Sequence, residues 1–128
     1  MTYRVYDFDR RDAQGNLREL HTDLALDAMD YRKRDDFRIA YSKEKNAAVP
    51  MVDSDYFRTT YLDLDASLSR EFQTDDSFRA YVCVGGSASL ELGPHSVPIQ
   101  RGETVLLPAA AAELQIVTRK CSLLEVSL

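Results

Sequence analysis

Residues 77–86, Ser-Phe-Arg-Ala-Tyr-Val-Cys-Val-Gly-Gly, decide the fold of this chain. From Ser77 to Val84 the side chains alternate at a period of two, which indicates a strand with one face turned to a core. Gly85-Gly86 follows at once and is a hairpin signal, because glycine adopts the positive φ angles of tight β-turns. The stretch therefore predicts a strand, a hairpin, and a returning strand over Ala88–Leu92.

The same alternation extends over the chain after Pro50. Short apolar-alternating runs recur at spacings of about ten residues and are separated by Gly and Pro, a pattern typical of antiparallel sandwiches and barrels. We expect a mainly β fold, an antiparallel jelly-roll β-sandwich. The expected strands are 56–64, 68–72, 77–84, 88–92, 96–99, 104–107, 114–118 and 122–126.

The first 50 residues follow a different pattern. Thr2–Phe8 alternates and predicts a strand, and Asp23–Met29 predicts one short helix with Thr22 as its N-cap. Its apolar face would carry Leu24, Ala25, Ala28 and Met29. Asp30–Val49 is charged and aperiodic, so we expect a linker there, with a short strand at Phe37–Ala40. The chain thus divides into residues 1–50, with the strand, helix and linker, and residues 51–128, the β domain.

Composition excludes several classes of function. The 128 residues carry a formal net charge of -5, which argues against nucleic acid as a partner, because phosphate contacts need clustered Lys and Arg. No apolar run reaches the roughly 18 residues of a membrane span, and we expect no membrane partner. With no export signal in the sequence, a cytoplasmic location and reduced core thiols at Cys83 and Cys121 are expected.

Gly102 and Pro108, with five residues between them, form a second informative motif. Glycine permits the tight turn into the strand between them, and proline ends that strand. Following Tyr81–Gly86, this spacing resembles the second signature motif of the cupin superfamily. The resemblance implies a cupin-like fold for residues 51–128.

Metal-binding cupins carry a His-x-His pair with a downstream Glu in their first motif and another His after the proline of the second. This chain has Glu113 where the last His would fall. His21 and His95 are far apart in the sequence, and we interpret both as surface or capping residues. We therefore expect a metal-free cupin domain, with no metal ligand and no cofactor held by this chain.

Arg4 and Arg10 are the candidate site residues. On a strand from Thr2 to Arg10 they would share one face with Tyr6 and Phe8 and form a cationic wall suited to a sugar phosphate, because guanidinium groups pair phosphate oxygens bidentately. The alternative is a surface strand whose arginines pair with Asp7, Asp9 and Asp12. From composition alone, the surface ion pairs are favoured.

Thr2–Arg10 and Leu17–His21 resemble a segment just past the middle of the bacterial class I mannose-6-phosphate isomerases, and Arg101–Val126 resembles the late strands of that family. The resemblance implies that Arg4 is the pocket arginine that assists proton transfer through an enediol, and that Arg10 lies nearer the substrate phosphate. In that family zinc is bound by upstream segments to which no residue of this sequence corresponds. The chain thus looks like the C-terminal part of a zinc isomerase, truncated before its metal-binding half.

Three hypotheses follow for function. The chain is an incomplete isomerase part, inactive alone or completed by another polypeptide that carries the ligands. Alternatively, it is a non-catalytic cupin module that binds a sugar phosphate or a protein partner. The third is a structural or dimerising remnant. An N-terminal strand with unpaired edge groups would favour a homodimer or a complementing chain.

Overall fold

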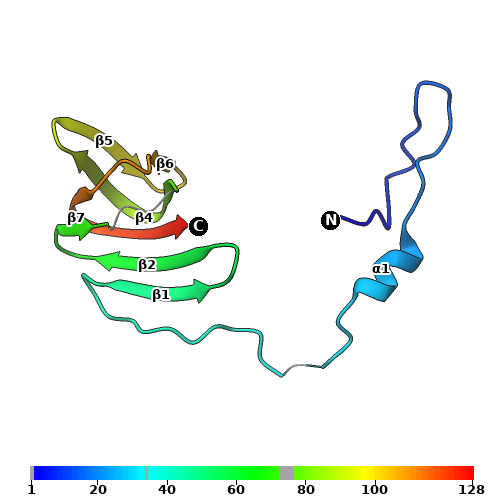
Figure 1. The fold of residues 1–128 in the computed structure, drawn as a ribbon, viewed down its shortest axis with the longest axis horizontal. Helices are drawn as coiled ribbons and strands as arrows, with labels where there is room; N and C mark the ends of the chain where they lie inside the picture. Colours follow the sequence, from blue (N-terminus) through cyan, green and yellow to red (C-terminus); the bar gives the residue numbers. More distant parts are fainter. Residues whose placement is uncertain (1, 34, 73–76) are drawn as a thin grey trace. The chain divides into compact units, whose positions relative to one another are not determined.

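Two long strands, β4 (Arg79–Leu92) and β7 (Glu113–Ser127), pair in antiparallel fashion along most of their length and form the centre of the fold. Figure 1 shows them in a computed structural model, which describes residues 2–33, 35–72 and 77–128. The chain consists of two units, Met1–Phe37 and Arg38–Leu128. Within the described residues, every strand belongs to the second unit, and the first contains the helix α1 (Thr22–Ala28).

The remaining strands extend the pairing of β4 and β7 on both sides. β7 pairs with β3 (Leu68–Glu71) through its first residues and with β2 (Arg58–Leu64) through its last, and β1 (Ala48–Asp53) pairs with β2 at the edge. β4 pairs with β6 (Thr104–Leu107) through its first residues and with β5 (His95–Gln100) through its last. All pairs are antiparallel, which confirms the prediction of a mainly β, jelly-roll architecture.

The core of the second unit follows from side-chain alternation on these strands. In β7 the buried positions are Leu114 and Ile116, and then Cys121, Leu123 and Glu125, so the alternation changes phase once between the two halves. This phase change explains why the sequence pattern predicted two strands, 114–118 and 122–126, where one is present. The other buried core residues are Leu62, Leu64, Tyr81, Cys83, Leu90, Ile99 and Leu107.

The hairpin predicted at Gly85-Gly86 is wrong. β4 continues through both glycines, and its register with β7 shifts between Cys83 and Gly85 and again between Ser87 and Ser89. Gly86 has φ of +69°, so it forms a bulge that bends the strand without reversing it. The chain reverses after Leu92, at Gly93-Pro94, where β5 begins.

Gly86 also marks a close approach of two backbones. A Cβ atom at this position would lie 2.2 Å from the carbonyl oxygen of Lys120, whereas one at Gly85 would meet Ser122 at an ordinary 3.7 Å. We expect Gly86→Ala to lower the free energy of unfolding by about 2 kcal/mol or more, because it adds strain at positive φ to a clash with backbone. Urea unfolding monitored by circular dichroism measures this change in the free energy of unfolding. Gly85→Ala is the matched control, and an equal loss for both variants would contradict the account.

Several predictions for the first 50 residues are wrong. Thr2–Phe8 forms no strand, so the argument for partner binding through an exposed N-terminal strand loses its basis. The short helix predicted at Asp23–Met29 is confirmed as α1, but its N-cap is His21 rather than Thr22 and makes no side-chain capping hydrogen bond. Only Ala25 of its predicted apolar face is buried. No strand forms at Phe37–Ala40.

β1 was not predicted, because it contains Pro50. A proline is tolerated there because β1 lies at the sheet edge and pairs only with β2, with an irregular register after Pro50. Within the described residues, α1 is the one helix, and it is far too short to cross a membrane.

Candidate functional site: an arginine cluster around Asp7

A tight turn in the first unit folds Arg10 back onto Asp7. Phe8 and Asp9 both adopt left-handed backbone angles, with φ of +52° and +54°, and the Arg10 amide donates a hydrogen bond to the Asp7 carbonyl at 3.1 Å. The Arg10 side chain then reaches the Asp7 carboxylate with two donors, Nε at 3.2 Å and Nη2 at 2.6 Å from Oδ1. Two consecutive non-glycine residues at positive φ are uncommon, and here they produce this side-chain pair.

Arg4 is held in place by the segment that precedes α1. The His21 amide donates to the Arg4 carbonyl at 2.7 Å, and the Arg4 amide donates to His21 Nδ1 at 3.3 Å. The Arg4 guanidinium donates through Nη1 to the Glu19 carbonyl at 2.9 Å, and its Nε lies 3.9 Å from Asp7 Oδ1. Backbone and side chain of Arg4 are therefore both fixed, and its guanidinium lies beside the carboxylate.

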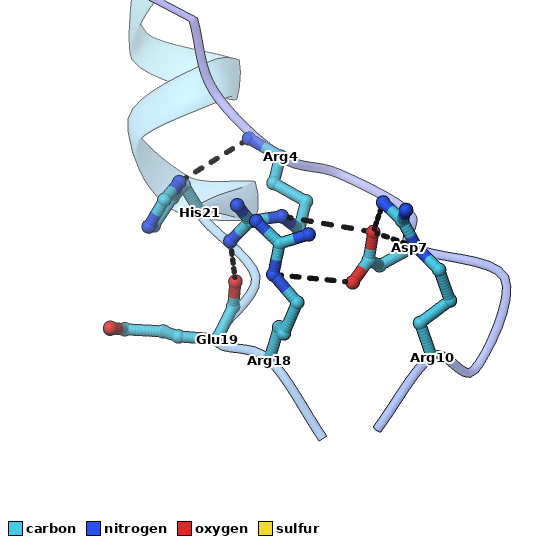
Figure 2. Close-up of polar contacts among 6 residues, drawn as sticks. All are labelled: Arg4, Asp7, Arg10, Arg18, Glu19 and His21. Atoms are coloured by element: carbon cyan, nitrogen blue, oxygen red, sulfur yellow. Dashed lines mark hydrogen bonds and ion pairs between the residues drawn. The ribbon is translucent and has the colours of Figure 1, made fainter. Parts of the chain in front are cut away.

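Arg18 completes a cluster in which three guanidinium groups surround one carboxylate, as Figure 2 shows. Its Nε lies 3.6 Å from Asp7 Oδ2, an oxygen that is buried and accepts no hydrogen bond within the described residues. Asp7 is only 8% exposed, whereas Arg10 and Arg18 are largely exposed. Three guanidinium groups thus surround one buried carboxylate, so the cluster has more positive than negative charge.

The hydrogen bond from Arg10, aided by the nearby charges of Arg18 and Arg4, holds the pKa of Asp7 below its usual range. A lowered pKa means that the cluster is intact above the ordinary carboxyl value and weakens as the pH falls through the lowered value. We expect Arg10→Ala to raise the pKa of Asp7, measured by NMR titration of its side-chain carboxyl carbon. Arg11→Ala, which removes an exposed arginine outside the cluster, should leave that pKa unchanged. An unchanged value in both variants would contradict the arrangement.

The structure brings Arg4 and Arg10 together, but not as the sequence predicted. They do not share one face of a strand with Tyr6 and Phe8. Both arginine side chains point to Asp7, as in the alternative hypothesis of ion pairs with neighbouring carboxylates. Tyr6 and Phe8 are exposed and contact each other edge to face, with ring centroids 4.9 Å apart. A hollow of about 120 Å³ lies beside the cluster. Its lining includes Tyr6, Asp7, Arg10 and Arg18.

A second cluster of polar side chains lies in the second unit. Glu125, on β7 and only 5% exposed, accepts two hydrogen bonds from Arg70 at 3.2 and 3.0 Å and one from the Tyr81 hydroxyl at 2.6 Å. Burial, followed by the charge of Glu125, raises the pKa of Tyr81, so the phenol stays protonated and donates. The buried carboxylate and phenol are satisfied by each other and by the partly exposed Arg70, which indicates a structural role for this network.

Zinc, which the family resemblance implies, does not fit the described residues. No group of three or more His, Cys, Asp or Glu side chains converges among residues 2–33, 35–72 and 77–128. His21 belongs to the first unit, and His95 to the second, where it opens β5 on the surface. Glu113, at the position of the missing cupin histidine, is exposed at the start of β7.

Sequence reasoning missed three functional or structural residues. In the sequence Asp7 is one of several candidate surface acceptors, whereas the structure shows it as the buried centre of the cluster, and the predicted site does not include Arg18. No local pattern reveals Arg18, because its contact with Asp7 depends on the turn between them. Glu125 had a usable signal, since it shares the alternating phase of Cys121 and Leu123 in a strand that is otherwise apolar on that face.

Comparisons with known proteins agree with this architecture. Residues 48–128 match the family described as "Mannose-6-phosphate isomerase, cupin domain". The curated protein "Putative mannose-6-phosphate isomerase YvyI" of Bacillus subtilis (strain 168) is 31% identical over 118 residues, which cover 90% of this chain and 36% of that protein. The crystal structure of the mannose 6-phosphate isomerase from Bacillus subtilis superposes with a TM-score of 0.68 at 28% identity, covering 98% of this chain and 40% of that one.

A cupin-2 domain protein from Shewanella frigidimarina shares the fold alone, with a TM-score of 0.55 at 9% identity over 66% of this chain and 82% of that chain. The chain spans little more than a third of the length of the curated relative, at 36%. The family match extends over more than half of the 128 residues and coincides with β1–β7. This chain therefore belongs to the mannose-6-phosphate isomerase family, and residues 48–128 are its cupin domain.

Proposed function

We propose that this chain supplies the C-terminal part of a mannose-6-phosphate isomerase, which interconverts mannose 6-phosphate and fructose 6-phosphate, and that it is not catalytic by itself. The observation that carries the proposal is the arginine cluster: Arg4, Arg10 and Arg18 around the single buried carboxylate of Asp7. It occupies the segment that resembles the family's pocket-forming region. Arg4 is the proposed catalytic arginine, and Arg10 the proposed contact of the substrate phosphate.

The charge of the cluster suits a phosphorylated sugar. Three guanidinium groups offer many more N–H donors than one carboxylate can accept, and Arg10 spends two of them on Asp7 Oδ1. The exposed part of Arg10 can pair with phosphate oxygens, for which a guanidinium is well shaped. Arg4 is less exposed and held through its backbone, which favours positioning close to the reacting carbons.

The chemistry of aldose–ketose isomerisation needs more than this chain offers. A proton must move between neighbouring carbons while an enediolate carries negative charge on oxygen. Arg4 can stabilise that charge, but no carboxylate of the cluster is available as a base, because Asp7 is buried among three arginines. Zinc, when bound in the complete family enzyme, would supply the Lewis acid. We therefore assign both the metal and the base to a part outside this chain.

The apolar surface of the first unit supports the same proposal. Ten large hydrophobic side chains are exposed among the described residues of this unit, and extensive exposed apolar surface marks interaction sites in soluble proteins. We propose that they pack against the metal-binding part of the isomerase fold, in the same polypeptide or in another. These residues are Val5, Tyr6, Phe8, Leu17, Leu20, Leu24, Leu26, Met29, Tyr31 and Phe37.

Reconstitution tests the proposal. The full chain is co-expressed with the upstream, metal-binding part of the Bacillus subtilis mannose 6-phosphate isomerase, and co-purification and zinc-dependent isomerase activity are measured. We expect a complex with activity that neither part has alone. Phe8→Ser should weaken the complex, whereas Val97→Ser, which removes an exposed apolar side chain of the second unit on β5, should not. An active complex unaffected by Phe8→Ser would overturn the proposed packing surface, and no activity in any complex would overturn the proposed function.

The alternative is a cupin module that binds a sugar phosphate without turning it over. It is favoured by one observation: the arginine cluster is assembled within the first unit, while no metal-ligand group accompanies it among the described residues. Titration calorimetry with mannose 6-phosphate, together with the activity assay, distinguishes the isomerase part from the binding module. Binding that Arg10→Ala weakens about tenfold, together with no turnover in any complex, would favour the module.

A further inference from the structure

Cys83 and Cys121 form a close thiol pair that the proposed function does not use. Cys83 lies on β4 and Cys121 on β7, and their Sγ atoms are 3.7 Å apart. Each is only 1% exposed. They are not directly opposite in the sheet: Cys83 pairs with Leu123, and Cys121 pairs with Gly86.

The bulge of β4 brings the two sulfurs together. The register shifts between Cys83 and Gly85, and the Cys83 side chain therefore lies close to Cys121, which is the partner of Gly86 in the sheet. Gly86 permits this, since its missing side chain lets β4 approach the Lys120 carbonyl more closely than any Cβ would allow. The Cys83 sulfur lies 3.4 Å and 3.6 Å from the Gly85 and Gly86 carbonyl oxygens, so backbone polar groups also fix its position.

We propose that Cys83 and Cys121 are a redox pair that closes to a disulfide between β4 and β7 when the chain meets a peroxide. The sulfurs must approach by about 1.7 Å to reach the bonded distance of about 2.0 Å, a movement that side-chain rotation and a small strand shift can provide.

The reaction balances with hydrogen peroxide as the oxidant. The thiolate of one cysteine attacks a peroxide oxygen, the O–O bond breaks, and a sulfenic acid and a water form after protonation. The second cysteine attacks the sulfenic sulfur, the S–S bond forms, and the hydroxyl leaves with a proton as a second water. Two thiols are oxidised by two electrons in total, and one peroxide is reduced to two waters.

Burial makes the reaction slow in the closed barrel. Desolvation, followed by the hydrogen bond with Cys83, raises the pKa of Cys121 to about 12, so it is a thiol at neutral pH. Peroxide must therefore reach the pair during local opening of β4 from β7. At high peroxide concentration the oxidation rate should no longer depend on that concentration, because the local opening of β4 from β7 becomes rate-limiting.

The cross-link should stabilise the barrel. It joins residues 38 apart in sequence and so restricts the unfolded chain, while the close sulfurs keep native strain small. We expect the melting temperature of the full chain to rise by about 10 °C on oxidation and to return with dithiothreitol.

The test uses the full chain and hydrogen peroxide, with intact mass, non-reducing peptide mapping and thermal melting as readouts. The expected product is lighter by two hydrogen atoms, carries a peptide cross-link between residues 83 and 121, and melts at a higher temperature. Cys121→Ala should instead give a peroxide adduct at Cys83 and no stabilisation. Sulfinic products on the wild-type chain, disulfides between two molecules, or a cross-linked form that melts lower would each overturn the proposal, independently of whether the isomerase assignment holds.

Discussion

Replacing Glu125 with leucine is expected to lower the free energy of unfolding by about 3 kcal/mol, the largest loss that we predict for a single residue. The Glu125 carboxylate accepts hydrogen bonds from Arg70 and Tyr81 inside the barrel. Leucine fits an apolar core, but it leaves a half-buried guanidinium without its counter-charge and a fully buried hydroxyl without its acceptor. Both groups then carry the cost of lost hydration without a protein partner.

Three further variants separate charge, hydrogen bonding and packing. Tyr81→Phe removes one donor and should cost about 1 kcal/mol, because Arg70 still satisfies the carboxylate. Glu125→Gln keeps the shape and should cost an intermediate amount. The double variant Glu125→Leu with Arg70→Met should recover part of the loss, since it removes the unpaired charge. Urea unfolding monitored by tyrosine fluorescence measures all four, and a Glu125→Leu chain as stable as wild type would contradict the network's role.

Replacing Arg4 with alanine is expected to lower kcat of the reconstituted isomerase by about 10²–10³-fold, if Arg4 carries the proposed catalytic role. A guanidinium fixed beside the developing enediolate stabilises charge that is absent in the bound substrate, so its removal should lower kcat more than it raises KM. Arg4 suits this role because its backbone and side chain are both anchored by the Glu19–His21 segment.

Two variants make this prediction specific. Arg11→Ala removes an exposed side chain that donates to the Gly15 carbonyl and does not contact Asp7, and it should leave kcat and KM unchanged. Arg4→Lys keeps the charge but loses the fork of donors, so it should restore only part of kcat. A general loss of structure would instead weaken substrate binding and lower the folded fraction together, and circular dichroism of the full chain would reveal it. Equal effects of Arg4→Ala and Arg11→Ala would contradict a specific role for Arg4.

Most strands of the β domain could be predicted from the sequence, because side-chain alternation reflects the two faces of a strand and Gly and Pro mark the turns. Where each strand ends could not be predicted. A bulge at Gly86 and a phase change within β7 interrupt the alternation without ending either strand. The local signal of glycine at positive φ is the same for a bulge and for a turn, and only the partner strand decides between them.

In the first unit, a predicted strand is absent. Thr2–Phe8 has the composition of a strand, but β-propensity is realised only where a partner strand supplies hydrogen bonds, and here the backbone turns at Phe8 and Asp9 instead. The candidate residues Arg4 and Arg10 could be named from the sequence, whereas their common acceptor could not. Asp7 is one of several nearby carboxylates in the sequence, and its ion pair with Arg18 depends on the turn between them.

The metal requirement is the most direct test of the account, because the account assigns the metal ligands to a part outside this chain. The purified chain alone is assayed for interconversion of fructose 6-phosphate and mannose 6-phosphate, with zinc supplied and with a chelator in a parallel sample. The account predicts the same background rate in both samples, since no metal-ligand group converges among the described residues. Zinc-dependent turnover by the chain alone would contradict it, and would mean that these residues assemble a metal site of their own.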